Sequence, residues 1–429
     1  MKKIGLFFCF FILCPTMVFA IEFQPIGFES LSMGGAGVAS ARGSFAVYYN
    51  PALLSKPVHG AEFALCVGVG AREVNLVDHI DKLADIDIEN TFDLMEEEAP
   101  GGIASSDVKD KINTIKNELQ SIAEKNGLQL MPTVSLGMQI KKFGFGIFGL
   151  SEATGYAVID SKHLDFIVKI DDDYYKYNET TGQYESSNET EYQNSSLQYA
   201  IENNLTYLKL AGLAYLEIPI AYAHEFETPF GTLTIGGAVK VMPGWTFDAK
   251  IDIDTASEDI DDELSDADKR DTSWGIDLGL LYKPTKIPGL KIGLVGKNLN
   301  TPKFDTAKGN TYKIKPMVRA GVAYDFWKIT FAADIDLTAN PTFIPNYKCR
   351  FIGGGFNFHP FSWFSLRGGI MGNVAEGDEG VIFTAGLGFG LKWFQLDIAG
   401  QVSSKKGHFQ EHAIPRYTRI QISLVSKWF

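Results

Sequence analysis

Several segments of this chain alternate apolar with polar residues, and the links between the fourteen strand-like segments fall into two classes of length. The second, fourth, sixth, eighth, tenth and twelfth segments are each followed by a very short link, and the odd-numbered segments by longer ones. Alternation with a period of two predicts half-buried strands. A soluble sandwich would alternate too, but nothing would sort its loops by parity. An even strand count with short turns at one end and long loops at the other is typical of outer-membrane barrels.

The predicted fold is all-β, a 14-stranded antiparallel transmembrane β-barrel surrounded by outer-membrane lipid. The strands are expected near residues 61–74, 129–141, 143–158, 205–226, 230–252, 271–283, 290–299, 312–326, 328–338, 347–359, 363–373, 380–392, 394–402 and 416–428. After residue 20 no run of 18 or more apolar residues occurs. Only helices and closed barrels satisfy every backbone group in lipid, so a membrane form of this chain has to be a barrel. The net charge of −13 argues against nucleic-acid binding, which needs a basic surface.

The first 20 residues have the layout of a secretory signal peptide. Lys2 and Lys3 precede an apolar run over residues 4–18, and Ala20 supplies the small residue expected before the cleavage site. The alternative is a single helical anchor, which is disfavoured because the run is short for a hydrocarbon core of about 30 Å. The prediction is an exported chain, cleaved after Ala20 and placed in the outer membrane of a bacterial cell.

Aromatic residues gather at the short-turn end of the predicted strands. They are Phe326, Trp327, Phe361, Trp363, Trp393, Phe394, Trp428 and Phe429. The belt of an outer-membrane barrel places such rings at one depth, whereas ordinary core aromatics would be scattered along the strands. The terminal Phe429 resembles the recognition signal of outer-membrane barrels, which implies the barrel-assembly machinery as a partner.

Charged residues on the inward phase of two neighbouring strands predict a polar lumen. If Phe326 and Trp327 form a two-residue turn, Arg319 lies directly opposite Asp334. Opposite charges at that position stabilise a sheet by roughly 0.2–1 kcal/mol. The sequence therefore predicts Arg319 and Asp334 as a charge pair in the lumen.

Three acidic insertions are expected at the long-loop end, near residues 75–128, 159–204 and 253–271. The first contains apolar residues three and four apart, which predict an amphipathic helix with Asp107 as a candidate cap. Its apolar stripe is Val108, Ile112, Ile115, Leu119 and Ile122. This helix packs on another loop, on the lumen, or on a partner. The acidic loops are solvated loops or weak sites for divalent ions, and the third matches a calcium loop poorly.

No catalytic or metal-binding pattern is evident, so we expect neither an enzyme nor a cofactor. The seven histidines are scattered, and none forms an H-E-x-x-H motif. Removal of the predicted signal peptide leaves Cys66 and Cys349, which form a disulfide or, as the favoured alternative, two separate apolar residues.

Two stretches near the N-terminus resemble the start of FadL-type outer-membrane proteins. Residues 28–38 are rich in glycine, with Gly34, Gly35 and Gly37, and residues 46–53 contain the motif Asn50-Pro51-Ala52. In that superfamily the motif belongs to an N-terminal hatch inside a 14-stranded barrel. Residues 293–300, 319–325 and 334–336 resemble the TraF-like conjugal-transfer branch of the superfamily.

This resemblance implies passive uptake of hydrophobic or amphipathic small molecules through a lumen that the hatch gates. The implied organisation is a signal peptide at 1–20, a hatch at 21–56 and a barrel at 57–429. The hatch residues Asn50, Pro51, Ala52, Gly34, Gly35 and Gly37 would control opening. Aromatic residues of the hatch either line a ligand pocket or simply pack the plug: Phe23, Phe28, Phe45, Tyr48 and Tyr49. The alternative function is a non-transporting component of the surface or of a conjugation or secretion apparatus.

Overall fold

The computed structural model describes residues 21–55, 61–122, 125–251, 267–390, 394–409 and 412–428. The predicted signal peptide, most of the third acidic loop, Trp393 and Phe429 lie outside these ranges. Within them, none of the helices is long and apolar enough to cross a membrane.

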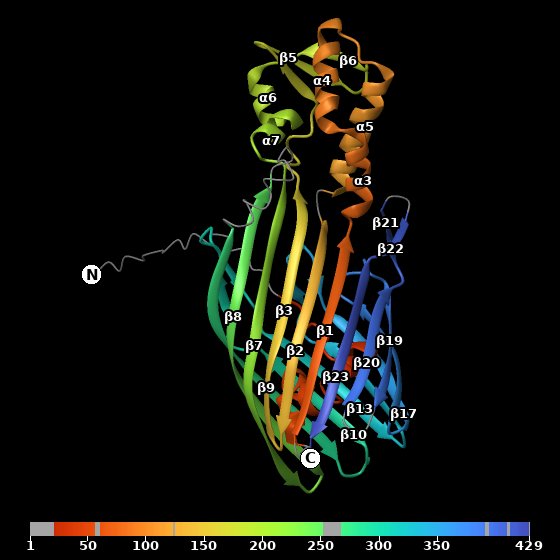
Figure 1. Ribbon diagram of the computed structural model, residues 1–429. Helices are drawn as coiled ribbons and strands as arrows, with labels where there is room; N and C mark the ends of the chain where they lie inside the picture. The colour runs from red at the N-terminus through yellow and green to blue at the C-terminus, as the bar shows by residue number, and fades with distance from the viewer. Residues whose placement is uncertain are drawn as a thin grey trace, which may run out of the picture.

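Fourteen antiparallel strands form a closed barrel, in which β1 pairs with both β2 and β23 (Figure 1). The strands are β1 (Ala61–Val74), β2 (Gly127–Ile140), β3 (Phe143–Val158), β7 (Tyr207–Thr228), β8 (Gly231–Ile251), β9 (Asp268–Pro284), β10 (Leu290–Lys297), β13 (Met317–Phe326), β14 (Ile329–Asp336), β17 (Phe351–Phe361), β18 (Phe364–Asn373), β19 (Val381–Gly390), β20 (Phe394–Ser403) and β23 (Tyr417–Trp428). The predicted fold class and the sorting of short and long links by parity are confirmed.

The alternation in sequence becomes an apolar outside and a polar inside. On β2, Leu130 and Leu136 are exposed on the outer surface, while Gln129 and Ser135 are buried toward the lumen. Successive side chains of a strand point to opposite faces of the sheet, so one alternating segment serves both environments. An apolar exterior around a polar interior is the arrangement of a transmembrane barrel.

Exposed aromatic side chains mark the short-turn end of the barrel. Trp327 is 75% exposed at the β13–β14 turn, and Phe361 and Trp363 are more than half exposed at the β17–β18 turn. The rings of Phe361 and Trp363 stack, with 5.4 Å between their centroids. This placement fits the predicted interfacial belt rather than core packing.

The predicted turn between β13 and β14 is wrong by one residue. Phe326 pairs with Ile329, so the turn is Trp327-Lys328, and Trp327 has a left-handed φ of 54°. The strands therefore place Arg319 opposite Asp336 rather than Asp334. The shift keeps all of these side chains on the lumen face, because it moves the pairing by two residues.

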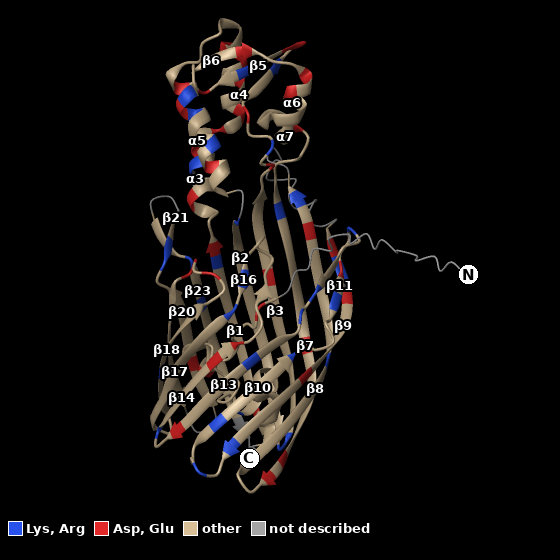
Figure 2. Ribbon diagram, turned by 180° about the vertical axis from the view of Figure 1, so that it is seen from behind, with Lys and Arg blue, Asp and Glu red and all other residues tan. Residues whose placement is uncertain are grey.

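The two acidic loops after β1 and β3 join in one cap above the long-loop end (Figure 1). The first loop forms α3 (Val77–Ile86), α4 (Ile88–Glu98), η3 (Ala99–Gly101) and α5 (Ser106–Ile122). The second forms β4 (Ile167–Ile170), β5 (Asp173–Asn178), β6 (Gln183–Ser186), α6 (Glu189–Ser195) and α7 (Leu197–Glu202). Figure 2 shows acidic residues along α4 and α6. Three small ribbons complete the long-loop end, namely β11–β12 (Lys303–Asp305, Thr311–Lys313), β15–β16 (Asn340–Pro341, Lys348–Cys349) and β21–β22 (Lys406–Phe409, His412–Pro415).

The cap has an apolar core of its own. The predicted stripe of α5 is buried, and most of it packs with Phe166 and Tyr184 from the second loop. Helix α5 begins at Ser106, one residue before Asp107, the predicted N-cap residue. Asp107 lies in the first turn, and the backbone N–H of Val108 donates instead to Ser105 Oγ at 3.3 Å. Of the packing alternatives left open by the sequence, packing on another loop is the observed one.

Lys176 joins two segments of the cap through its ammonium group. Its Nζ lies 2.9 Å from Asp165 Oδ2 and 2.7 Å from Glu191 Oε1. The hydrogen bond between Lys176 and Glu191 is the largest cause of a raised pKa at Lys176 and of a lowered pKa at Glu191. A lowered carboxyl pKa stabilises the fold above the ordinary pKa of 4.5, and that stabilisation is lost as pH falls through the folded pKa.

We therefore expect the cap to lose part of its protease resistance as pH falls below the ordinary carboxyl pKa of 4.5, because protonated Glu191 no longer pairs with Lys176, which itself stays charged throughout the acid range. Limited proteolysis across pH, with cleavage sites mapped to residues 159–206, measures this. Lys176→Met should make the cap more sensitive at pH 7 and flatten the acid-induced change. An unchanged pH profile in Lys176→Met would contradict this role for the lysine.

Candidate functional site

Residues 21–55 fill the barrel interior at the short-turn end and form the hatch (Figure 1). The hatch contains α1 (Phe28–Ser32), η1 (Gly43–Phe45), α2 (Ala46–Tyr49) and η2 (Pro51–Ser55). All of its side chains are buried except Glu29, which is partly buried, and Arg42. Irregular backbone of this kind is tolerated at membrane depth only when protein surrounds it.

The glycine-rich turn of the hatch lies against the wall strands β17, β18 and β19. Gly34 and Gly35 have positive φ angles of 67° and 78°, which L residues rarely adopt. A side chain at Gly34 would also collide with the backbone of Gly354 and Ile370. The backbone N–H of Gly34 donates to Thr384 Oγ1 at 3.0 Å. Glycine is therefore required here both for the turn and for its close approach to the wall.

The Asn-Pro-Ala motif fastens the hatch to the opposite side of the barrel. Asn50 Nδ2 donates to the carbonyl oxygens of Val38 at 2.9 Å and of Leu280 in β9 at 3.1 Å. Its Oδ1 accepts from the backbone N–H of Ala52 at 3.0 Å. Pro51 opens η2 where its missing N–H costs nothing. One asparagine side chain thus forms hydrogen bonds with the backbone of the hatch, of the following turn and of the barrel wall.

Asp334 binds the backbone of the hatch and is not the ion-pair partner of Arg319. Its Oδ2 accepts from the backbone N–H groups of Gly37 at 2.7 Å and Val38 at 2.9 Å. Arg319 instead donates through Nε to Asp336 Oδ1 at 2.6 Å. The predicted lumen pair is therefore corrected, since each of its two residues has a different closest partner. Both still face the lumen beside the hatch.

The five hatch aromatics divide into two groups. Phe23, Tyr48 and Tyr49 pack on one another, with Tyr48 and Tyr49 centroids 5.2 Å apart, and both tyrosine hydroxyls bond to backbone carbonyls of the hatch. These three residues pack the plug. Phe28 and Phe45 form an edge-to-face pair 6.0 Å apart and line a cavity. The ligand-lining prediction therefore fits only the second group.

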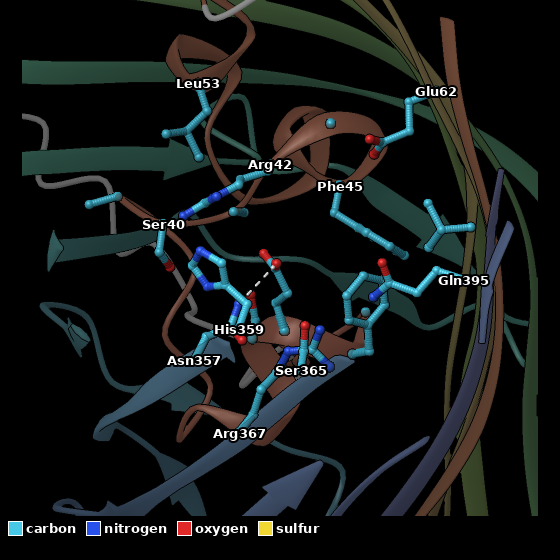
Figure 3. A pocket seen from close by; sticks show the side chains of 18 of the residues that line it. Ser40, Arg42, Phe45, Leu53, Glu62, Asn357, His359, Ser365, Arg367 and Gln395 are labelled. Carbon is cyan, nitrogen blue, oxygen red and sulfur yellow. Dashed lines mark hydrogen bonds between the residues drawn. The ribbon is translucent and has the colours of Figure 1, made fainter. Parts of the chain in front are cut away.

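This cavity has a volume of about 380 Å³ and lies between the hatch and the short-turn ends of the strands. The lining includes Ser40, Arg42, Phe45 and Leu53 of the hatch and Glu62, Asn357, His359, Ser365, Arg367 and Gln395 of the wall (Figure 3). Natural ligand pockets have volumes of about 300–1,000 Å³. The cavity is therefore large enough for a small molecule.

The cavity combines aromatic rings with charges that are already partnered. The guanidinium of Arg367 lies 4.7 Å from the Phe28 ring and donates to Asp397 Oδ1 at 2.7 Å. Arg42, half-exposed, donates to Thr330 Oγ1 at 2.8 Å. Asn357 Nδ2 donates to Glu29 Oε1 at 3.3 Å, the bond drawn in Figure 3. Such a lining suits a molecule with an apolar body and a polar end.

The wall residues of this cavity were not among the residues predicted from the sequence. Arg367 and Ser365 occupy the inward phase at the start of β18, next to a short turn, and Gln395 does the same on β20. Inward polar residues within a few positions of a short turn were the available signal. The sequence does not reveal how far into the barrel the hatch extends, and therefore which of these residues it leaves uncovered.

Buried ion pairs fill the lumen on the long-loop side of the hatch. Lys240 Nζ lies 2.8 Å from Glu217 and 2.9 Å from Asp277, and Lys297 lies 3.2 Å from the other oxygen of Glu217. All four side chains are nearly inaccessible. A continuous apolar passage is thus interrupted at this level. Among the described residues, no cluster of His, Cys, Asp and Glu could hold a metal ion, and Cys66 and Cys349 are both free and buried.

Comparison with known proteins gives one family and several solved structures. The family model described as "F plasmid transfer operon, TraF, protein" matches residues 47–336. The Ralstonia pickettii toluene transporter TbuX is 13% identical with a TM-score of 0.49, covering 95% of this chain and 100% of that chain. The Pseudomonas putida toluene transporter TodX is 14% identical (TM-score 0.46, 95% and 98% covered), and a Pseudomonas aeruginosa FadL homologue is 9% identical (TM-score 0.47, 95% and 99% covered). Among curated proteins no match was found.

Proposed function

The chain belongs to the family described as "F plasmid transfer operon, TraF, protein", and we propose that it is an outer-membrane barrel that takes up small amphipathic molecules through a lumen gated by its hatch. In this proposal residues 1–20 are the cleaved signal peptide that exports it. The short turns then face the periplasm and the acidic cap faces the outside, as in other outer-membrane barrels.

The observation that carries the proposal is the cavity of about 380 Å³ directly beneath the hatch. Its walls offer Phe28 and Phe45 to an apolar body, and Arg42, half-exposed beside Asp325 and Thr330, to a polar end. Because hatch and wall contribute to the same cavity, a molecule bound there contacts both. Displacement of the hatch would therefore change the affinity of the site, which is the coupling that gating requires.

Passage requires the hatch to move. Its attachment to the wall includes the hydrogen bonds of Asn50, Asp334 and Thr384, further bonds from Gln401 and Arg319 to its backbone, the ion pair of Glu22 with Arg72, and close packing against wall glycines. Each neutral hydrogen bond contributes about 0.5–1.5 kcal/mol, so the loss of any one of them weakens the closed arrangement by about that amount. The ion pairs above the hatch make a wholly apolar ligand a poorer candidate than an amphipathic one.

A second candidate function is a component of the surface or of a conjugation apparatus that transports nothing. Two observations favour it, namely the lumen filled by Lys240, Lys297, Glu217 and Asp277 and the acidic cap with its own core. The family description also names a transfer operon. In this reading the hatch is a permanent plug and the cap is the working surface.

Filling the cavity separates the two functions. Ser365 lines the cavity, and the next residue, Leu366, is exposed on the outer surface of the same strand. We expect Ser365→Trp to abolish, and Leu366→Trp to preserve, both co-purification of an amphipathic compound and uptake of a fluorescent amphiphile into proteoliposomes. Organic extraction with mass spectrometry identifies the compound.

The outcome that favours the second function is equally concrete. If the purified barrel carries no compound, and if both tryptophan variants match the unmodified protein in uptake at background level, transport is contradicted. Partner capture through residues 75–126 and 159–206 would then be the relevant assay.

A further inference from the structure

A cluster of charged side chains surrounds the beginning of the hatch, at the far side from the cavity. Arg72 in β1 is its centre and is fully buried. Its guanidinium donates to Glu22 Oε2 at 2.6 Å through Nη2, to Glu379 Oε1 at 2.9 Å through Nε and to Gln129 Oε1 at 2.6 Å through Nη1. One cation therefore serves two buried carboxylates, Glu22 and Glu379.

A third carboxylate, Glu152 in β3, has no cation in contact with it among the described residues. Its Oε1 accepts from the backbone N–H of Glu22 at 3.1 Å and from Gln24 Nε2 at 3.4 Å. Its Oε2 accepts from Gln129 Nε2 at 2.9 Å. Glu152 is fully buried.

The orientation of the Gln129 amide is fixed, because its oxygen accepts from Arg72 and its nitrogen must then face Glu152. The same holds for Gln24, whose Oε1 accepts from Arg419 Nη2 at 3.3 Å. All three neighbours of Glu152 thus donate to it. None of these three donors carries a positive charge, so an ionised Glu152 has no counter-charge in contact with it.

With Glu152 ionised, the cluster as described is short of one positive charge. Glu22, Glu152 and Glu379 supply three negative charges, whereas Arg72 and Arg419 supply two positive charges. A buried charge without a counter-charge is costly in a medium of low polarity. By contrast, the Lys240–Glu217–Asp277–Lys297 cluster is balanced, with two charges of each sign.

Ile21 is in the right place to supply the missing charge. It is 1% exposed, and its nitrogen precedes by one residue the Glu22 nitrogen that already bonds Glu152. Consecutive Cα atoms are about 3.8 Å apart, so the Ile21 nitrogen lies within the same cluster. In the uncleaved chain this nitrogen is an amide and carries no charge.

We infer that hydrolysis of the peptide bond between Ala20 and Ile21 creates an α-ammonium group that pairs with Glu152 and neutralises this cluster. Water adds across the bond, leaving a carboxylate on Ala20 and the ammonium on Ile21. Processing of the chain thereby completes the attachment of the hatch to the wall. The site is a receptor for a primary ammonium, and the occupant is the new N-terminus of the same chain.

The test combines processing, reactivity and stability in the full-length barrel purified from membranes. N-terminal sequencing should give Ile21 as the first residue. A reagent selective for α-amines, such as 2-pyridinecarboxaldehyde, should label the chain in urea and fail to label the folded barrel. Lysines do not interfere, since the reagent requires the neighbouring N-terminal amide.

Comparing the effect of acetylation in the unmodified chain and in a Glu152 variant then tests whether Glu152 is the partner of the α-ammonium group. The chain acetylated at its α-amine while unfolded and then refolded in detergent should melt at lower temperature than the free amine. In Glu152→Gln the same acetylation should have little effect, because the charge that needed the ammonium is gone. Ser151→Ala, which leaves Glu152 in place, should retain the full effect of acetylation.

Three results would overturn the inference. One is a mature N-terminus other than Ile21, including a chain that keeps its first 20 residues as an anchor. Another is labelling of the folded barrel at the rate of the unfolded chain, which needs no variant to measure. The third is equal destabilisation by acetylation in the unmodified chain and in Glu152→Gln.

Discussion

Arg72→Met is expected to destabilise the barrel by about 3–5 kcal/mol, because removing one partner of a buried ion pair leaves the other uncompensated. Two carboxylates, Glu22 and Glu379, would lose their only direct cation among the described residues. The guanidinium also lies 5.3 Å from the Tyr417 ring and 5.5 Å from the Tyr347 ring, contacts that methionine replaces only in part. The effect should therefore exceed that of an ordinary apolar substitution.

The measurement is the urea midpoint of the refolded barrel in detergent, read from the heat-modifiable mobility on SDS gels. Arg270→Met is the matched control, because Arg270 is exposed at the start of β9. Exposed substitutions usually change stability by no more than about 0.5 kcal/mol. Equal midpoints for the two variants would mean that the cluster around Arg72 contributes nothing to the attachment of the hatch.

The strands were predictable because each one has one face toward lipid and the other toward the lumen. Alternation places lipid-facing and lumen-facing residues in register with the pleat, and β1 (Ala61–Val74) and β3 (Phe143–Val158) begin and end at the predicted residues. The predicted strand at 312–326 was wrong in one respect. It is divided into β12 (Thr311–Lys313) and β13 (Met317–Phe326), with Pro316 between them. Proline cannot donate to the ladder, and alternation alone does not reveal where pairing stops.

The site was predictable only in its local parts. The glycines and the Asn-Pro-Ala motif fix turns within the hatch, and short-range turn chemistry can be read from the sequence. Their wall partners cannot, because Asn50 meets Leu280 and Gly37 meets Asp334 across more than 200 residues. The register error at Trp327 has a different, local origin: Phe326-Trp327 and Trp327-Lys328 could each have formed the two-residue turn.

The wall glycines offer a way to displace the hatch without altering it. Gly236 of β8 faces the lumen, and a Cβ built there would collide with the backbone of Pro51 and Ala52. The next residue, Gly237, faces outward, and its Cβ would lie 3.6 Å from Leu278, an ordinary contact. Gly236→Val and Gly237→Val therefore make the same chemical change on opposite faces of one strand.

We expect Gly236→Val to raise the efflux of small solutes from proteoliposomes, and Gly237→Val to leave it unchanged. The displaced motif would give up its hydrogen bonds, each contributing about 0.5–1.5 kcal/mol. Each loss of about 1.4 kcal/mol raises the population of the displaced hatch tenfold. Heat-modifiable mobility must first establish that both barrels are closed. If Gly236→Val then leaks no more than Gly237→Val, the lumen stays blocked even when the Asn-Pro-Ala motif has lost its contact with the wall. In that case the buried ion pairs rather than the hatch form the barrier. That result would move the protein from gated uptake to the second function, in which the barrel serves only to carry its acidic cap.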